Sequence, residues 1–229
     1  MRFDIITIFP KIFDSWVSES IVKKAIDKGL IQIITHDIRE HALQPHRSVD
    51  DTTYGGGAGM VMRPEPIFEC VESIPLNGRC RRILLTPQGE PLKQPKVKKL
   101  AEFDQIMLIC GRYEGVDERA RKIIADEEIS LGDYVTAGGE MPAVILMEAV
   151  LRLIPGVIGN NRSLEEESFE GDLLEYPQYT RPEVFRGEKV PDILLSGHHA
   201  EIANWRRQKA IERTKERRPD LVDKSSKKG

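Results

Sequence analysis

The sequence is poor in cysteine and in long apolar runs, and each shortage excludes a class of protein. Its three cysteines, Cys70, Cys80 and Cys110, form no Cys-x-x-Cys pair, which fits neither a secreted disulfide framework nor a zinc ribbon. The longest apolar stretch, Met141 to Ile154, is interrupted by charged residues and is too short to span a membrane. We therefore expect a soluble, cytoplasmic protein with no membrane partner.

Two nucleotide-binding motifs are also missing. The run GGGAGMVMR has no Lys-Ser or Lys-Thr pair, which a P-loop needs in order to reach phosphate and magnesium. The first apolar run is followed by Phe9-Pro10-Lys11, where a dinucleotide-binding fold carries Gly-x-Gly-x-x-Gly. These absences disfavour NAD and nucleoside triphosphates as ligands, and they leave an NTP-dependent switch as a remote alternative.

What is present is an alternation of short apolar runs with helical stripes. The run at the N-terminus contains Asp4, ends at Pro10 and lacks a small-residue cleavage site, so it predicts a strand and not a signal peptide. Strand-like runs cover Phe3–Phe9, Ile31–Thr35, Arg82–Leu85, Ile106–Cys110 and Ile129–Val135, and helical segments cover Ile12–Ala25, Pro95–Phe103, Val116–Ala125 and Ala143–Ile154. This order predicts an α/β fold with a parallel sheet, helices on both faces, and ligand binding at the carboxyl ends of the strands.

The 229 residues leave room for a small second part beside the main domain. We expect a main domain at 1–159, a flexible acidic linker at 160–175 and a C-terminal helical domain at 176–229, with a helix from about His199 to Arg218. Trp205 to Gly229 holds ten Lys or Arg against four Asp or Glu, although the whole chain has a net charge of −3. A basic tail favours a polyanionic partner, while a solvated helix face is the simpler alternative.

Four glycine-rich segments follow predicted strands. They are YGGGAGM, TPQG, GRYEG and the pair GDY with GGE. Glycine lets the backbone approach a ligand closely, and several such loops at neighbouring strand ends would form one pocket walled by main-chain amides and carbonyls. Each loop alone indicates only a turn, but the four together predict a site for a small adenosine-like ligand.

Ionisable residues near the predicted linker are the candidates for chemistry. Arg152 lies on an otherwise apolar helix, so its charge needs an anionic partner, and an ion pair with Glu148 one turn earlier is the simplest one. The histidines, among them His36, His41 and His46 at intervals of five, have no metal-binding spacing. We expect no metal ligands from the protein, and we expect Cys110 to be an inert core residue.

At these motifs the sequence resembles the bacterial tRNA (guanine-N1)-methyltransferases of the SPOUT class, the TrmD family. The matching stretches are FDIITIFP, HRSVDDTTYGGGAGMVMRPEP, LLTPQGEPL, CGRYEGVDER, ISLGDYVTAGGEMPA, LRLIPGVIG, YPQYTRPEVFRG and PDILLSGHHAEI. They cover nearly the whole chain in the family's order. The resemblance implies a trefoil-knotted SPOUT domain, a small C-terminal helical domain and a homodimer with its active site at the subunit interface. Periodicity gives no sign of a knot.

The resemblance also implies a reaction. S-adenosylmethionine would donate a methyl group to N1 of the guanosine at tRNA position 37, next to the anticodon, and magnesium is a second cofactor that it suggests. The donor would lie against Leu84, Leu85, Thr86, Pro87, Gln88, Gly89, Gly111, Tyr113, Glu114, Ser130, Leu131, Gly132, Asp133, Tyr134, Val135, Thr136, Gly138, Gly139 and Pro142.

By the same resemblance, a carboxylate is the general base and Arg152 stabilises the charge that develops on guanine O6. The family usually has Asp where this sequence has Glu167, so the base is Glu167 or its neighbour Glu166, and it would come from the other subunit. The anticodon stem-loop of tRNA would contact Asp50, Gly59, Glu114, Arg181, Arg186, Arg206, Arg207 and Lys209. The departure at Glu167 keeps a second hypothesis open, a non-catalytic RNA-binding protein that retains the fold.

Overall fold

The chain folds into two compact units, Met1–Gly159 and Asn160–Gly229. A computed structural model describes residues 1–159, 167–169 and 173–225. Most of the predicted acidic linker at 160–175 therefore lies outside the described residues, and its flexibility stays a prediction. Within the described part of the chain, no helix is long and apolar enough to cross a membrane.

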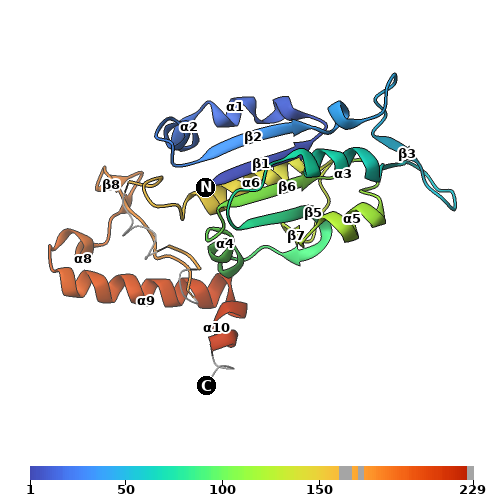
Figure 1. Ribbon diagram of the computed structural model, residues 1–229. Helices are drawn as coiled ribbons and strands as arrows, with labels where there is room; N and C mark the ends of the chain where they lie inside the picture. The colour runs from blue at the N-terminus through green and yellow to red at the C-terminus, as the bar shows by residue number, and fades with distance from the viewer. Residues whose placement is uncertain (160–166, 170–172, 226–229) are drawn as a thin grey trace. The chain divides into compact units, whose positions relative to one another are not determined.

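The first unit is built on a five-stranded parallel sheet (Figure 1). The strands lie in the order β2 (Gln32–Asp37), β1 (Arg2–Thr7), β6 (Gln105–Cys110), β5 (Cys80–Pro91) and β7 (Glu127–Ser130). All six residues of β6 are buried, and this central strand accordingly has an unbroken apolar run from Ile106 to Cys110 with no alternation. The predicted α/β fold class is confirmed, while the trefoil knot stays a prediction.

Both faces of the sheet are covered, because successive side chains of a strand point to opposite sides. Phe3 and Ile5 of β1 pack in one core with α2 (Ser20–Asp27), α4 (Gln94–Leu100) and α6 (Glu140–Leu151). Ile6 of the same strand packs in the other core, with η2 (Ile38–His41), α3 (Pro64–Ser73) and α5 (Glu118–Ile124). The loops at the carboxyl ends of the strands are thus held on a rigid two-sided core.

The prediction of one continuous helix over Ile12–Ala25 is wrong. The segment forms η1 (Pro10–Phe13), α1 (Asp14–Val17) and then α2. The break falls at three polar residues: the Ser18 hydroxyl donates to the carbonyl of Ser15 at 2.9 Å, and Ser20 has a left-handed φ of 56°. The Ser18 hydrogen bond competes with helix continuation, and the φ of Ser20 is not a helical one. Gly29, with a left-handed φ of 69°, follows the end of α2.

Strand β5 is longer than the sequence predicts. The segment TPQG was expected to be a turn after Leu85, but β5 runs on to Pro91 and its pairing with β7 shifts between Leu85 and Glu90. A side chain at Gly89 would place its Cβ 2.5 Å from the backbone of Glu128 and Ile129. Glycine is therefore required here, because it lets the end of β5 cross close to β7 after the irregularity.

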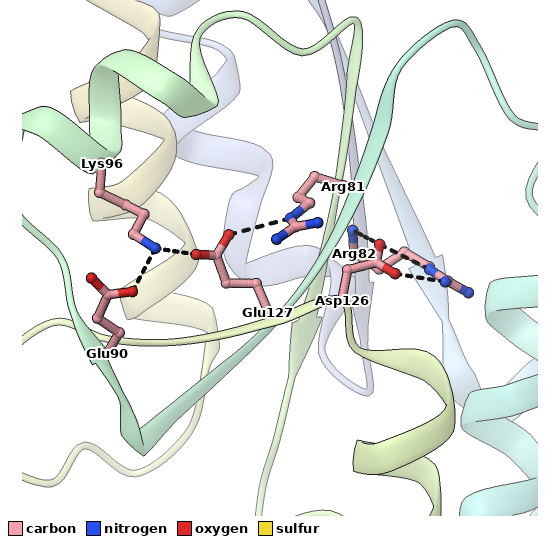
Figure 2. Close-up of polar contacts among 6 residues, drawn as sticks. All are labelled: Arg81, Arg82, Glu90, Lys96, Asp126 and Glu127. Atoms are coloured by element: carbon pink, nitrogen blue, oxygen red, sulfur yellow. Dashed lines mark hydrogen bonds and ion pairs between the residues drawn. The ribbon is translucent and has the colours of Figure 1, made fainter.

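Charged side chains hold this irregular strand in place (Figure 2). Glu127 of β7 accepts from Arg81 of β5 at 3.3 Å and from Lys96 of α4, and Lys96 also donates to Glu90 at 2.6 Å. Next to them, Arg82 donates two side-chain hydrogen bonds to Asp126, at 2.7 and 3.2 Å. Hydrogen bonds to Glu127 and Glu90 raise the pKa of Lys96, which keeps it charged at neutral pH. The network joins β5, β7 and α4 next to Glu127, the first residue of β7.

Shorter elements complete the two units. In the first unit, β3 (Asp50–Thr52) and β4 (Met60–Met62) form an antiparallel hairpin that the sequence did not predict. The second unit has the small hairpin β8 (Val184–Phe185) and β9 (Glu188–Lys189), followed by α8 (Asp192–Leu195), α9 (His199–Arg217) and α10 (Pro219–Ser225). Helix α9 agrees with the helix expected from about His199 to Arg218.

Candidate functional site

A pocket of about 350 Å³ lies at the carboxyl ends of the three adjacent strands β6, β5 and β7. Its walls come from three stretches of chain, residues 84–88, 111–121 and 129–142, and mix apolar side chains with glycine-rich backbone. Parallel sheets bind ligands at this edge, because the connecting loops there expose main-chain donors and acceptors. The structure thus gathers the later three of the glycine-rich segments around one space.

Most of the residues predicted to bind the donor line this pocket. They are Leu84, Leu85, Thr86, Pro87, Gln88, Gly111, Tyr113, Glu114, Ser130, Leu131, Tyr134, Val135, Thr136, Gly138, Gly139 and Pro142. Gly89, Gly132 and Asp133 do not line it; Gly89 instead supports the β5–β7 crossing. Sequence reasoning missed Arg112, Gly115, Val116, Glu118, Arg121, Ile129 and Ala137, which also line the wall. Whether these residues bind a donor stays a prediction.

Gly139 fixes how closely two of the pocket loops approach each other. Its N–H donates to the carbonyl of Gly111 at 2.9 Å, which ties the loop before α6 to the loop after β6. A Cβ on Gly139 would lie 2.7 Å from the Cα of Cys110, closer than real Cβ atoms come. The glycine that sequence analysis assigned to ligand contact is thus needed for backbone packing as well.

The hairpin β3–β4 lies against one wall of the pocket. The N–H of Glu114 donates to the carbonyl of Met60 at 3.0 Å, and Met62 donates to the carbonyl of Gly115 at 2.9 Å. Gly59 is so close to the Glu114 side chain that a Cβ there would collide with the carboxylate. The structure therefore brings Gly59 and Glu114 together, and their contact with a tRNA base stays a prediction. Asp50 lies farther along the hairpin, paired with Met62.

Arg152 lies at the other end of α6 from the pocket. It caps the C-terminus of the helix, whereas Gly139 is the N-cap residue. Since an α-helix rises 1.5 Å per residue, the two are about 20 Å apart. Arg152 lines a separate groove of about 560 Å³ that includes Trp16 and Ile145. Within one copy of the chain, Arg152 and the pocket do not form a single site.

The groove beside Arg152 is unusually apolar for a solvent-facing surface. The indole N–H of Trp16 donates to the carboxylate of Glu148, the residue expected to pair with Arg152, at 3.3 Å. Ile145 and Met141, on the same helix, are 52% and 50% exposed. This face of α6 is well suited to being covered by another protein surface.

The predicted general base lies in the second unit. Glu167 is half-buried in a bend, next to Ser168, whose hydroxyl accepts a hydrogen bond from the N–H of Glu175 at 3.0 Å. The alternative, Glu166, lies outside the described residues.

Several of the predicted RNA-binding residues are exposed on the second unit. Arg181, Arg186 and Arg207 are exposed, and the Arg186 guanidinium lies 5.4 Å from the ring centre of Phe185. The Arg206 guanidinium stacks 4.7 Å from the ring centre of Tyr176, and Lys209 forms a 2.7 Å ion pair with Glu212. The exposed arginines are free to meet phosphates, and their contact with RNA stays a prediction.

Two other kinds of chemistry would use the cysteines as nucleophiles or the described residues as metal ligands. Each of the three cysteines is unpaired. Burial raises the pKa of Cys70 to about 12 and that of Cys110 well above its usual range, so neither thiol is ionised at neutral pH. Among the described residues there is no group of three or more His, Cys, Asp or Glu arranged to hold a metal ion. The suggestion of magnesium gains no support from these residues.

The chain matches the family model described as tRNA (Guanine-1)-methyltransferase TrmD over residues 1–224. It is 56% identical over 223 residues to the tRNA (guanine-N(1)-)-methyltransferase of Gloeobacter violaceus, covering 97% of this chain and 98% of the relative. It is 54% identical over 224 residues to the protein of the same name in Geobacillus kaustophilus, covering 97% and 92%. With that of Geobacter sulfurreducens it shares 49% identity over 226 residues, covering 98% and 92%.

Proposed function

The chain belongs to the tRNA (guanine-1)-methyltransferase family, and from that premise we propose that it transfers a methyl group from S-adenosylmethionine to N1 of the guanosine at tRNA position 37, beside the anticodon. The observation that carries the proposal is that the glycine-rich loops at the ends of β5, β6 and β7 line one pocket. Family membership makes the enzyme a tRNA methyltransferase; the donor, the target position and the residue roles are what we propose.

The pocket fits an adenosine-containing donor. Leu85, Leu131 and Pro142 offer apolar contact for a flat base, and the loops around them offer main-chain groups that can hydrogen-bond to its edges. When bound, S-adenosylmethionine would supply an electrophilic methyl group on a sulfonium sulfur. Glu114, on the wall next to the β3–β4 hairpin, would place a carboxylate where the incoming guanine presents its N–H groups.

The chemistry of guanine defines what the protein must add. N1 carries a proton at neutral pH and becomes a good nucleophile only as that proton leaves, which puts negative charge on O6. We assign removal of the N1 proton to the Glu167 carboxylate, a role that typically contributes about 10²–10⁴-fold to a rate. We assign stabilisation of O6 to Arg152, whose guanidinium is permanently charged and donates in a plane.

These roles require a second copy of the chain. Arg152 is at the far end of α6 from the pocket of its own copy, about 20 Å away at the helical rise. The half-exposed Met141 and Ile145 and the groove that contains Arg152 form one apolar face along α6. We propose that two copies pack through this face, so that Arg152 of one copy reaches the pocket of the other. The active enzyme is then a homodimer.

The second unit, whose C-terminal segment Trp205–Gly229 holds ten Lys or Arg against four Asp or Glu, would hold the RNA. Its exposed arginines meet backbone phosphates, while the target base leaves the anticodon loop and enters the pocket, as enzymes that act on a base require. The exposed hairpin loop that ends at Gly59, next to Glu114, would close over this base.

The proposal is tested by incubating purified protein with radiolabelled S-adenosylmethionine and unmodified tRNA. Transcripts carrying G or A at position 37 should differ sharply: label enters the G transcript as 1-methylguanosine, identified by nuclease digestion and chromatography, and not the A transcript. Equal labelling of the two would contradict the assignment. Tight binding of both with no transfer would favour the non-catalytic RNA-binding alternative.

A further inference from the structure

A buried carboxylate lies between two pocket loops, and the proposed reaction does not use it. Glu140 is the first residue of α6, and its side chain is 1% exposed. One carboxylate oxygen accepts from the hydroxyl of Thr7, at the end of β1, at 2.7 Å. The other accepts from Nε of Arg112, in the loop after β6, at 2.8 Å. The cluster of Glu140, Arg112 and Thr7 thus joins a helix, a loop and a strand end.

Arg112 extends this cluster to the third segment of the pocket wall. Its Nη1 donates to the carbonyl of Ala137 at 3.2 Å, and its guanidinium stacks 4.7 Å from the ring centre of Phe9. Gly138 is so close that a Cβ there would collide with the Arg112 side chain. Arg112 therefore holds the 134–139 loop by a direct hydrogen bond and by close packing, and all six residues of this loop line the pocket.

The chemistry of Glu140 favours one arrangement of the cluster. A buried carboxylate without a partner is strongly unfavourable. The charge of Glu140 therefore stabilises Arg112 in this one position. The negative charge at the start of α6 also faces the positive end of the helix dipole. The orientation of the Thr7 hydroxyl is fixed as well, because its oxygen accepts a hydrogen bond from the N–H of Phe9 at 2.9 Å.

We propose that Glu140 is a positioning residue for methyl transfer: by holding Arg112 against Ala137, it keeps the 111–116 and 134–139 loops in the arrangement that binds the donor. The proposal rests on the proposed function, since it takes S-adenosylmethionine as the occupant of the pocket. Its effect is therefore on donor binding, and the methyl-transfer step depends on other residues.

The test compares Glu140→Gln and Arg112→Lys with a matched control. Glutamine removes the charge that holds Arg112, whereas lysine keeps the buried pair of charges but cannot donate to both Glu140 and Ala137. Asp126→Asn is the control, because Asp126 also accepts two side-chain hydrogen bonds from an arginine, Arg82, and lies outside the pocket lining (Figure 2).

Two readouts separate positioning from simple loss of stability. In steady-state assays, both test variants should raise the KM for S-adenosylmethionine by about tenfold or more, while kcat at saturating donor falls by less than about threefold. A merely structural role would lower kcat through loss of active enzyme and leave KM unchanged. In donor-free protein, hydrogen exchange of the amides of residues 134–139 should speed up in the test variants and not in Asp126→Asn.

Unchanged donor KM together with unchanged exchange in both test variants would overturn the proposal. Should Glu140→Gln fail to fold, Arg112→Lys still decides the matter, because it retains the charge pair. If the wild-type protein does not bind S-adenosylmethionine, the proposed function fails, whereas the donor-free exchange measurement still decides whether Glu140 holds the loop.

Discussion

Replacing Arg152 with alanine lowers kcat for methyl transfer by about 10²–10³-fold, the range found when one group that stabilises developing negative charge is removed. The affinity for S-adenosylmethionine stays within about twofold of wild type, because Arg152 is assigned to guanine O6, whose charge develops only in the transition state, and does not line the donor pocket of its own copy. The measurement is single-turnover methyl transfer with excess enzyme, together with calorimetric titration of the donor.

The control for this prediction is Arg152→Lys, which keeps the charge and loses the planar pair of donors, and should recover only part of the rate. Sedimentation of each variant shows whether the dimer persists, since Arg152 lines the groove through which we expect two copies to pack. A parallel loss of donor affinity in Arg152→Ala would mean that the residue supports the fold and is not part of the catalytic machinery.

The second large effect is expected at Glu167. Glu167→Gln removes a carboxylate that can accept the N1 proton and keeps the size of the side chain, so single-turnover rates should fall by about 10²–10⁴-fold. Glu167→Asp restores the carboxylate and should retain most of the activity, because aspartate is the residue usual in the resembled family. Binding of tRNA, measured by filter retention, should be close to wild type in both variants.

Glu166→Gln is the matched control for that assignment, because it makes the same chemical change one position earlier in the chain. A rate loss in Glu166→Gln with near-normal Glu167→Gln would move the general base by one residue. Full activity in both variants would contradict catalysis by a carboxylate from this segment.

The sheet was predictable from sequence because its strands are buried on both faces, so that segments such as Ile106–Cys110 appear as unbroken apolar runs. The break in the first helix and the continuation of β5 past Gly89 were not, since they depend on a left-handed Ser20 and on contact with β7. Short-range patterns carry no information about such contacts.

The same reasoning explains what sequence analysis recovered of the site. Glycine-rich loops after strands mark the pocket wherever the backbone itself forms the wall, as at Gly111 and Gly139. The pair Arg112 and Glu140 was missed, because two charged residues 28 positions apart give no sign in the sequence that they meet. The motif that contains Arg152 indicated its importance but not that it lies far from the pocket of its own chain.

The most direct test of the shared active site mixes two inactive variants. Arg152→Ala has an intact pocket, and Gly139→Ala should lose donor binding, because its Cβ would meet the backbone of Cys110 at 2.7 Å. Gly159→Ala, at a glycine with nothing within 4 Å, is the control. Calorimetric titration and thermal melting first establish that Gly139→Ala is folded and does not bind the donor.

Equal amounts of the two inactive variants are then unfolded and refolded together, and 1-methylguanosine formation is measured. If Arg152 acts on the pocket of the other copy, each mixed dimer contains one complete site, and random pairing restores about a quarter of wild-type activity. If Arg152 acts within its own chain, no mixed dimer has a complete site. An inactive mixture in which sedimentation and mass analysis show mixed dimers would contradict the account.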